Sequence, residues 1–257
     1  MKKTIYSVLI AIICALVNPF GVYSQEMMYI TKTDKSVLTI PISEIEKITY
    51  KNSVSPSTGN TVTDIDGNVY NTVKIGTQTW MQSDLKVTRF NDGTPIANVI
   101  VNEQWFKTTA AAYCWYNNEK PNSNNPYGAM YNGFAARMSS LCPKGWHVPS
   151  MSELEELVKY CGRMGADSPK KLKEAGRSHW VENPESVTNE TGFTALPTGW
   201  RKNWGDFEQR GNNGFWWTNT GSGLYQGSMR IHENNVPTYF APKTTIQFGG
   251  CVRCLMD

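Results

Sequence analysis

The N-terminus constrains this chain most, because it decides in which compartment the chain folds. Lys2 and Lys3 precede an apolar stretch, residues 5–17, which is too short to span a membrane. Small or tolerated residues follow as far as Ser24. A charged start, a short apolar stretch and such a cleavage site are typical of a secretory signal peptide. We therefore expect residues 1–24 to be removed after Ser24, and the mature chain to be secreted or exposed at the cell surface.

The net charge argues against nucleic acids and anionic membranes as partners. The chain carries 25 Lys and Arg against 22 Asp and Glu, a formal net charge of +3. Proteins that bind nucleic acids or anionic membranes through bulk charge need a stronger positive excess than this. A membrane-spanning helix needs about 20 apolar residues, and no segment after residue 24 supplies them. We expect no nucleic-acid partner and no transmembrane segment in the mature chain.

The expected export of the chain determines how its cysteines are interpreted. Of six cysteines, Cys14 leaves with the signal peptide, and the others are Cys114, Cys142, Cys161, Cys251 and Cys254. In an oxidising compartment such residues are disulfide candidates before they are metal ligands or catalysts. The motif formed by Cys251 and Cys254 lies in a predicted final strand, residues 246–256, where residues three apart point to opposite faces. We therefore expect neither a redox nor a metal site there, and the odd number leaves one thiol free or bonded between molecules.

The chain divides into a small element and a main domain. Residues 25–50 alternate as a β-hairpin around a turn near Asp34, followed by a helical turn near Ser43 and a short apolar segment, residues 48–50. Residues 51–60 are polar and predict a linker. Residues 61–257 form the main domain.

Several local signals place turns and helices in the main domain. Asp66-Gly67 predicts a hairpin turn rather than a calcium loop, because an EF-hand beginning at Asp64 would need Glu where Ile75 stands. A helix begins at Ser152, with Ser150 as an alternative cap, and ends at Gly162. A second, short helix is capped by Ser168, with Pro169 at its first position, and ends before Gly176. A weaker helical pattern covers residues 131–138. Residues 180–242 show little periodicity and predict a long irregular region, where a ligand site would most easily lie.

Six segments of the main domain form an ordered pattern. They are VTDIDGNVYNTVKIGTQTWMQSDL (62–85), NDGTPI (91–96), YGAMYN (127–132), CPKGWHVPSMSELEEL (142–157), GFTALPTGWR (192–201) and VRCLMD (252–257). This pattern resembles the Fibrobacter succinogenes major paralogous domain. The resemblance implies an α+β fold distantly similar to C-type lectin-like folds and to the formylglycine-generating group. Such a fold has small antiparallel sheets, two to three short helices and a long irregular loop region.

The lectin-like comparison also implies a disulfide. In that fold a cysteine after the first helix bonds to one at the end of the last strand, and Cys142 and Cys254 occupy those places. Cys251 then needs a different partner, for which Cys114 and Cys161 compete.

The same comparison points to sugar binding through tryptophan rings. The candidate ligand-binding residues are Trp200, Trp204, Trp216, Trp217 and Asn219, with Asn212 and Asn213 as further hydrogen-bonding groups. Most tryptophans in such a domain fill the core. Strand alternation predicts that one of Trp216 and Trp217 is buried and the other exposed, and the exposed one is the best contact candidate. The segments 182–184 and 217–219 only partly match the motifs of calcium-dependent lectins.

These observations favour a non-enzymatic module that binds glycan or protein at the bacterial surface, with no cofactor. The first alternative is a structural or adhesive surface protein without a small-ligand site. The second is a formylglycine-generating-type oxidase that uses a cysteine pair. His147, His179 and His232 have no sequence partners that would make a triad or a metal site. His147 is expected to form structural hydrogen bonds at the turn before the helix, and Glu153 to support the start of that helix.

Overall fold

The structure is a computed structural model of the chain, and it falls into two compact units, Met1–Ser53 and Val54–Asp257. It describes residues 7–9, 27–31, 36–44, 60–120, 122, 125–162, 167–184, 186–234 and 238–257. The predicted linker, apart from Asn60, and residues 48–50 lie outside the described residues, as does most of the predicted signal peptide.

The first unit is a three-stranded antiparallel sheet. Its strands are β1 (Ser7–Leu9), β2 (Met27–Thr31) and β3 (Val37–Pro41), followed by the 3-10 turn η1 (Ile42–Glu44). Met28 lies opposite Ile40 in the β2–β3 pair, so the predicted hairpin is confirmed. β1 lies within the predicted signal peptide and pairs with the other edge of β2.

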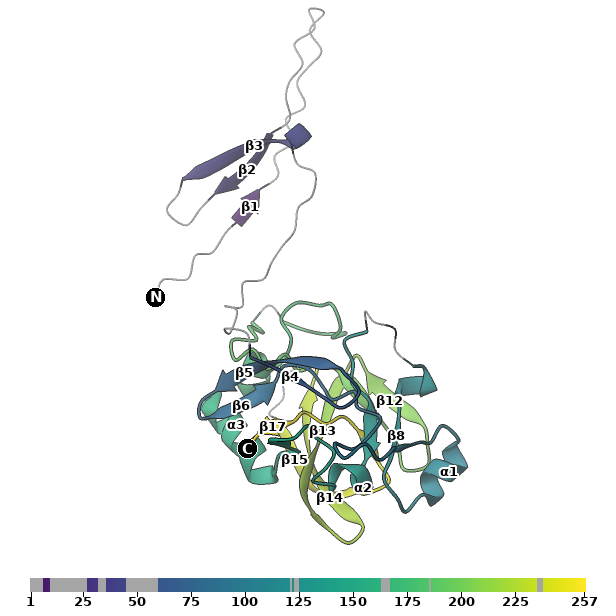
Figure 1. Ribbon diagram of the computed structural model, residues 1–257. Helices are drawn as coiled ribbons and strands as arrows, with labels where there is room; N and C mark the ends of the chain where they lie inside the picture. Colours follow the sequence, from purple (N-terminus) through teal and green to yellow (C-terminus); the bar gives the residue numbers. More distant parts are fainter. Residues whose placement is uncertain are drawn as a thin grey trace, which may run out of the picture. The chain divides into compact units, whose positions relative to one another are not determined.

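The second unit combines three sheets with short helices (Figure 1). In the described residues, the first sheet has the order β10 (Trp146–His147), β17 (Leu255–Met256), β6 (Gln78–Met81), β5 (Val69–Ile75) and β4 (Thr61–Thr63). The second has the order β12 (Phe207–Arg210), β11 (Thr198–Arg201), β16 (Gly249–Gly250), β9 (Met130–Asn132), β8 (Ala112–Cys114) and β7 (Ala97–Asn98). The third has the order β13 (Asn213–Ser222), β14 (Tyr225–His232) and β15 (Tyr239–Thr245).

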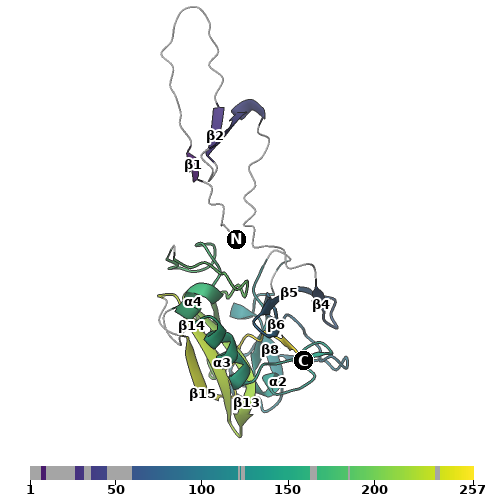
Figure 2. The same cartoon turned by 90° about the vertical axis from the view of Figure 1, so that its left-hand side faces the viewer.

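The helical segments of this unit are short. They are α1 (Asn102–Lys107), the 3-10 turn η2 (Tyr116–Asn118), α2 (Gly133–Ala136), α3 (Met151–Tyr160) and α4 (Asp167–Leu172). Figure 2 shows α3 lying along the third sheet, and it contacts both β13 and β14. Small, mostly antiparallel sheets with few helices confirm the α+β class. No helix in the described part of the chain has the length and apolar character needed to cross a membrane.

Among the described residues, the irregular region predicted over 180–242 is irregular only as far as residue 197, apart from one isolated bridge at Ala195; from Thr198 the chain forms strands β11 to β15, so that part of the prediction is wrong. Two glycines of these sheets, Gly214 and Gly250, stand where a neighbouring ring needs the space. A side chain on Gly214 would collide with the Trp216 ring, and one on Gly250 with the Phe215 ring. Glycine in a strand often marks such a close approach.

The predicted hairpin turn at Asp66-Gly67 is confirmed between β4 and β5. Gly67 has a φ of 85°, and the Asp64 carboxylate accepts hydrogen bonds from the backbone N–H groups of Asp66 and Asn68. The other oxygen of Asp64 accepts from the Tyr70 hydroxyl, at 2.6 Å. The carboxylate therefore serves the turn and the core beneath it.

Helix α3 is capped by Ser150, and the first predicted cap, Ser152, lies inside the helix. The Ser150 hydroxyl accepts from the Glu153 N–H, and a Glu153 carboxylate oxygen accepts from the Ser150 N–H at 2.7 Å, which completes a capping box. His147 Nε2 lies 3.0 Å from Glu153 Oε1, and its Nδ1 lies 2.6 Å from Asp257 Oδ1. The structural parts predicted for His147 and Glu153 are thus confirmed.

Two other helix boundaries differ from their predictions. α4 begins at Asp167, so Ser168 is inside the helix and its hydroxyl lies 3.1 Å from that of Thr238. The pattern over residues 131–138 begins as strand β9 and turns helical only at Gly133, where the Asn132 side chain caps α2. A capping asparagine favours extended backbone at its own position, which explains the change of conformation there.

Replacing Ser150 by Ala is expected to lower the free energy of unfolding by about 1 kcal/mol, because one end of the α3 capping box loses its partner. Urea denaturation measures the change. Ser152→Ala is the matched control, with an expected change of less than about 0.5 kcal/mol. Equal effects of the two substitutions would contradict the assignment of the cap.

The capping box also makes stability depend on pH. Partial burial acts to raise the pKa of Glu153, but hydrogen bonds from Ser150 and His147 outweigh it and hold the pKa below its ordinary value. The folded-state pKa is therefore lower than the unfolded one, so the stabilisation is present above the unfolded value and is lost as pH falls through the folded value. Glu153→Gln is expected to flatten this part of the stability profile below about pH 5. Urea titrations across that range test it, and an unchanged slope would contradict it.

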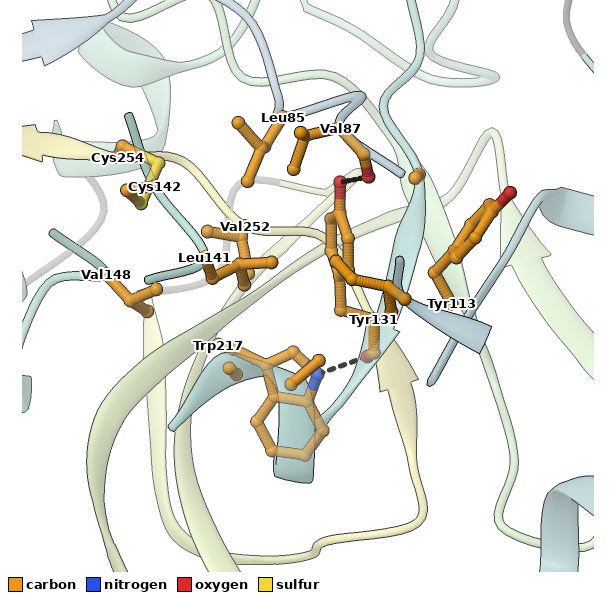
Figure 3. Close-up of a cluster of buried hydrophobic side chains, with 14 of the residues drawn as sticks. Leu85, Val87, Tyr113, Tyr131, Leu141, Cys142, Val148, Trp217, Val252 and Cys254 are labelled. Carbon is orange, nitrogen blue, oxygen red and sulfur yellow. Dashed lines mark hydrogen bonds between the residues drawn. A yellow bond between two sulfur atoms is a disulfide. The ribbon is translucent and has the colours of Figure 1, made fainter. Parts of the chain in front are cut away.

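Strand β13 separates two clusters of buried apolar side chains. Phe215 and Trp217 belong to the first cluster and Trp216 to the second, as alternation along a strand requires. In the first cluster, the Trp217 indole donates to the Tyr131 carbonyl at 2.8 Å, and the Tyr131 hydroxyl donates to the Val87 carbonyl at 2.7 Å (Figure 3). Both faces of the first half of β13 are therefore covered.

The disulfide implied by the resemblance is confirmed. Cys142 and Cys254 are bonded at 2.03 Å, with their Cα atoms 6.0 Å apart and a separation of 112 positions in sequence, and they lie within the first cluster (Figure 3). The predicted bond from Cys251 to Cys114 or Cys161 is wrong, because all three are buried free thiols in the second cluster. There they pack as small apolar residues.

Candidate functional site

Trp204 is the one predicted contact tryptophan that the structure exposes, with 51% of its surface accessible. It lies in the tight turn between β11 and β12, which is closed by a hydrogen bond from the Lys202 N–H to the Asp206 carbonyl at 2.7 Å. The indole Nε1 donates to Asp206 Oδ2 at 2.7 Å, and Lys202 Nζ lies 4.7 Å from the ring centroid. Lys202 also pairs with Glu208, at 2.5 Å. The ring is thus exposed and held in one orientation.

A polar hollow adjoins this turn, with a volume of about 510 Å³. Its lining residues are Asn102, Asn117, Asn118, Gly205, Asp206 and Phe207. We call it the amide hollow. Amide and carboxylate groups both accept hydrogen bonds and the amides also donate them, so the lining matches a ligand rich in hydroxyl groups.

Arg201 holds the amide hollow together from beneath. Its buried guanidinium donates to the Gly205 carbonyl at 2.9 Å, to the Val99 carbonyl at 2.6 Å and to the Ile100 carbonyl at 3.1 Å. It also donates to Asn102 Oδ1 at 2.9 Å. Burial lowers the pKa of this guanidinium. One cation therefore joins the turn that carries Trp204 to the start of α1.

The 3-10 turn η2 contributes another part of the lining of the amide hollow, through Asn117 and Asn118. Asn117 and Asn118 have φ angles of 55° and 60°, a left-handed conformation that asparagine tolerates better than most residues. The Asn118 side chain donates to the Ile100 carbonyl at 3.0 Å, which ties η2 to the same segment that Arg201 holds. Both asparagines are exposed.

The other predicted contact residues lie elsewhere. Trp216 and Trp217 are both buried, so the prediction that one is exposed is wrong. Trp216 lies in the second cluster, and its indole donates a hydrogen bond to Asp84, while Trp217 lies in the first cluster. Trp200 is 8% exposed, and Asn219 is exposed in the outer half of β13, where its N–H donates to the Pro149 carbonyl.

A second hollow, of about 800 Å³, lies between the β5–β6 turn and α3. Tyr160 lines it and packs against Gly76, and Glu155, Glu156 and Lys159 contribute charges. The Thr77 hydroxyl donates to Glu156 at 2.7 Å across it. This hollow has an exposed tyrosine but lacks the asparagine lining of the first.

The three free thiols among the described cysteines are buried, and burial changes their pKa values. Burial raises the pKa of Cys114 and of Cys161 to about 11, and burial also raises the pKa of Cys251. A raised pKa keeps a thiol protonated and unreactive. Among the described residues, no group of three or more His, Cys, Asp or Glu could hold a metal ion.

The comparison with protein families decides the chain's identity. The family model for the Fibrobacter succinogenes major domain matches residues 73–256. The chain belongs to this family. In the two other comparisons, no curated protein and no solved structure matches this chain. The amide hollow, its Trp204 turn and the Cys142–Cys254 bond all lie inside the matched Fibrobacter succinogenes major domain.

Sequence reasoning found Trp204 but missed the residues beside it. Asn102, Asn117, Asn118 and Asp206 come from three segments that only the fold brings together. The adjacent asparagines at 117 and 118 are a turn signal, and this signal was the one local hint. Nothing near Asn102 in the sequence indicates that Arg201 would bind it.

Proposed function

We propose that this Fibrobacter succinogenes major domain is an exported, non-enzymatic module that binds a glycan at the bacterial surface. Export rests on the signal-peptide pattern, with cleavage near Ser24, and is compatible with the Cys142–Cys254 disulfide. Cleavage there removes β1 and leaves the β2–β3 hairpin. The observation that carries glycan binding is the fixed, exposed ring of Trp204 next to a hollow lined by asparagines.

The chemistry of the amide hollow fits a carbohydrate. The apolar face of a sugar ring can lie on an indole, while its hydroxyls exchange hydrogen bonds with amides and a carboxylate. Binding sites of this kind combine a small number of placed polar groups with aromatic surface. A calcium ion needs six to eight oxygen ligands, whereas Asp206 is the single carboxylate of this lining. We therefore expect binding without calcium.

The buried cysteines weigh against the oxidase alternative. A reactive pair would have to include Cys251 or Cys254 in the motif near the C-terminus. Cys254 is bonded to Cys142, and Cys251 is buried with a raised pKa.

Replacing Trp204 by Ala is expected to weaken glycan binding about thirtyfold or more, the usual cost of truncating a central aromatic contact. A glycan array with the mature chain, with and without EDTA, identifies a ligand, and titration calorimetry then compares the variants. Tyr160→Ala removes the exposed ring of the other hollow and is the matched control, with unchanged binding expected. Loss of binding in the Tyr160 variant alone, or binding that EDTA abolishes, would contradict this site.

A second candidate function, adhesion to a protein, is favoured by the first unit. The hairpin exposes Tyr29, Val37 and Leu38, and η1 exposes Ile42. Large exposed apolar side chains are a feature of interaction surfaces. Two results together would favour adhesion over glycan binding. The first is that no glycan on the array binds. The second is that the intact mature chain captures one partner from an outer-surface extract, whereas a Leu38→Asp variant does not.

A further inference from the structure

Arg210, the last residue of β12, lies between two tyrosine rings. Its guanidinium carbon is 4.3 Å from the centroid of the Tyr116 ring and 4.1 Å from that of the Tyr127 ring. Tyr127 in turn meets the ring of His179 edge-on, at 5.6 Å. Stacking on aromatic faces orients a guanidinium while leaving its N–H edge open to hydrogen bonding. The rings thus fix the direction of this cation.

No acceptor satisfies this guanidinium among the residues that the structure describes. Its Nε is buried without a hydrogen bond. The side chain as a whole is partly exposed, and it forms no ion pair with any described residue. The side-chain oxygens of Asn212 and Asn213, in the same turn, are likewise buried without a described partner. A ligand cannot reach the buried Nε, so the two terminal nitrogens of Arg210 are the groups of this side chain that a ligand could bind.

The other ring-stacked arginines differ from Arg210. Arg201 donates to four acceptors, and Arg253 pairs with Asp84 at 2.7 Å. Arg230 also has no acceptor in the described part of the chain, but it lies over Trp200, Phe215 and Phe248, and none of the ring contacts described for these three rings involves a residue that lines the amide hollow.

One aromatic ring connects Arg210 with the amide hollow. Phe207, which lines the hollow, has its ring centroid 5.3 Å from that of Tyr116, and the guanidinium carbon of Arg210 lies 4.3 Å from the Tyr116 centroid. Arg210 is thus separated from the lining of the hollow by a single ring, a spacing that an oligosaccharide can bridge.

The geometry selects a carboxylate as the partner. A planar guanidinium matches the two oxygens of a carboxylate in a bidentate pair. The Glu174 carboxylate is already within 2.8 Å of Nδ1 of His179, the residue whose ring meets Tyr127. A single cation suits a monoanion better than a phosphate dianion.

We propose that Arg210 is a carboxylate-binding subsite, and that the glycan bound here is acidic, with a uronic acid residue at Arg210 and a neighbouring residue in the amide hollow. This inference rests on the glycan-binding function proposed above and names the class of glycan.

Titration calorimetry with a trigalacturonate and with its fully methyl-esterified form tests the subsite, because esterification removes the charge of each carboxyl group and adds only a methyl group. The mature chain is expected to bind the acid about tenfold or more tightly than the ester at low salt, as expected for charge-assisted hydrogen bonds. Arg210→Gln should abolish the preference and leave binding of the ester unchanged. Arg210→Lys, which keeps the charge but not the bidentate geometry, should retain only part of it. Lys74→Gln removes the same charge from β5 and is the matched control.

The outcomes separate this inference from the proposed function. Equal binding of acid and ester, or a preference that survives Arg210→Gln, overturns the subsite while glycan binding through Trp204 stands. A preference that depends on Arg210 but not on Trp204 keeps the carboxylate subsite and overturns the place proposed for the neighbouring sugar. Binding of an acidic peptide, such as oligoglutamate, in place of both sugars overturns the acidic glycan, as does the absence of binding to either sugar. Thermal denaturation of each variant confirms that the fold is kept.

Discussion

Replacing Asp84 by Ala is expected to lower the free energy of unfolding by about 3–5 kcal/mol, because it leaves a buried arginine without its counter-charge. Arg253 and Asp84 are each 1% exposed; Asp84 Oδ1 accepts a hydrogen bond from Arg253 Nε at 2.8 Å and lies 2.7 Å from Arg253 Nη2. The same oxygen accepts from the Trp216 indole at 2.8 Å. Guanidinium denaturation of the purified mature chain measures the effect.

An exposed ion pair provides the control for this prediction. Lys107 and Glu103 pair on α1 with most of both side chains in solvent. Glu103→Ala is expected to change stability by less than about 0.5 kcal/mol, as is usual for exposed helix pairs. If Asp84→Ala cost no more than Glu103→Ala, the ion pair would not be buried in the folded protein.

The second large effect is expected from the disulfide. Replacing both Cys142 and Cys254 by Ala should destabilise the domain by up to about 4–5 kcal/mol, since the bond closes a loop of more than a hundred residues in the unfolded chain. Denaturation with and without a reductant provides an internal control. Reductant should destabilise the wild-type chain toward the level of the double variant and leave the double variant unchanged. Equal stability of oxidised and reduced wild-type protein would show that the bond does not constrain the unfolded chain.

How far the sequence predicts the fold depends on whether a signal is local. The capping pair at Ser150 and Glu153, the turn at Asp66-Gly67 and the β2–β3 hairpin use residues close in sequence, and all three are found. The Cys142–Cys254 bond was implied by family resemblance rather than by any local pattern. The partner expected for Cys251 was wrong, because nothing in its neighbourhood shows that the second cluster takes up three cysteines as apolar side chains.

The pair Trp216 and Trp217 shows why the rest could not be predicted. Alternation correctly places the two rings on opposite faces of β13. Whether the outer face meets water depends on distant segments such as the one carrying Asp84, which the strand itself does not specify. The candidate site has the same limit. Trp204 can be recognised from its residue type, whereas the asparagines beside it come from segments about a hundred residues away.

The hydrogen bonds of Arg201 determine which residues around the amide hollow can be replaced. Three of its four acceptors are main-chain carbonyls, those of Val99, Ile100 and Gly205, which are present whatever side chains occupy those positions. A substitution at Trp204, whose side chain Arg201 does not contact among the described interactions, is therefore expected to leave the Arg201 hydrogen bonds in place. The exposed ring can then be changed without loss of the packing beneath it.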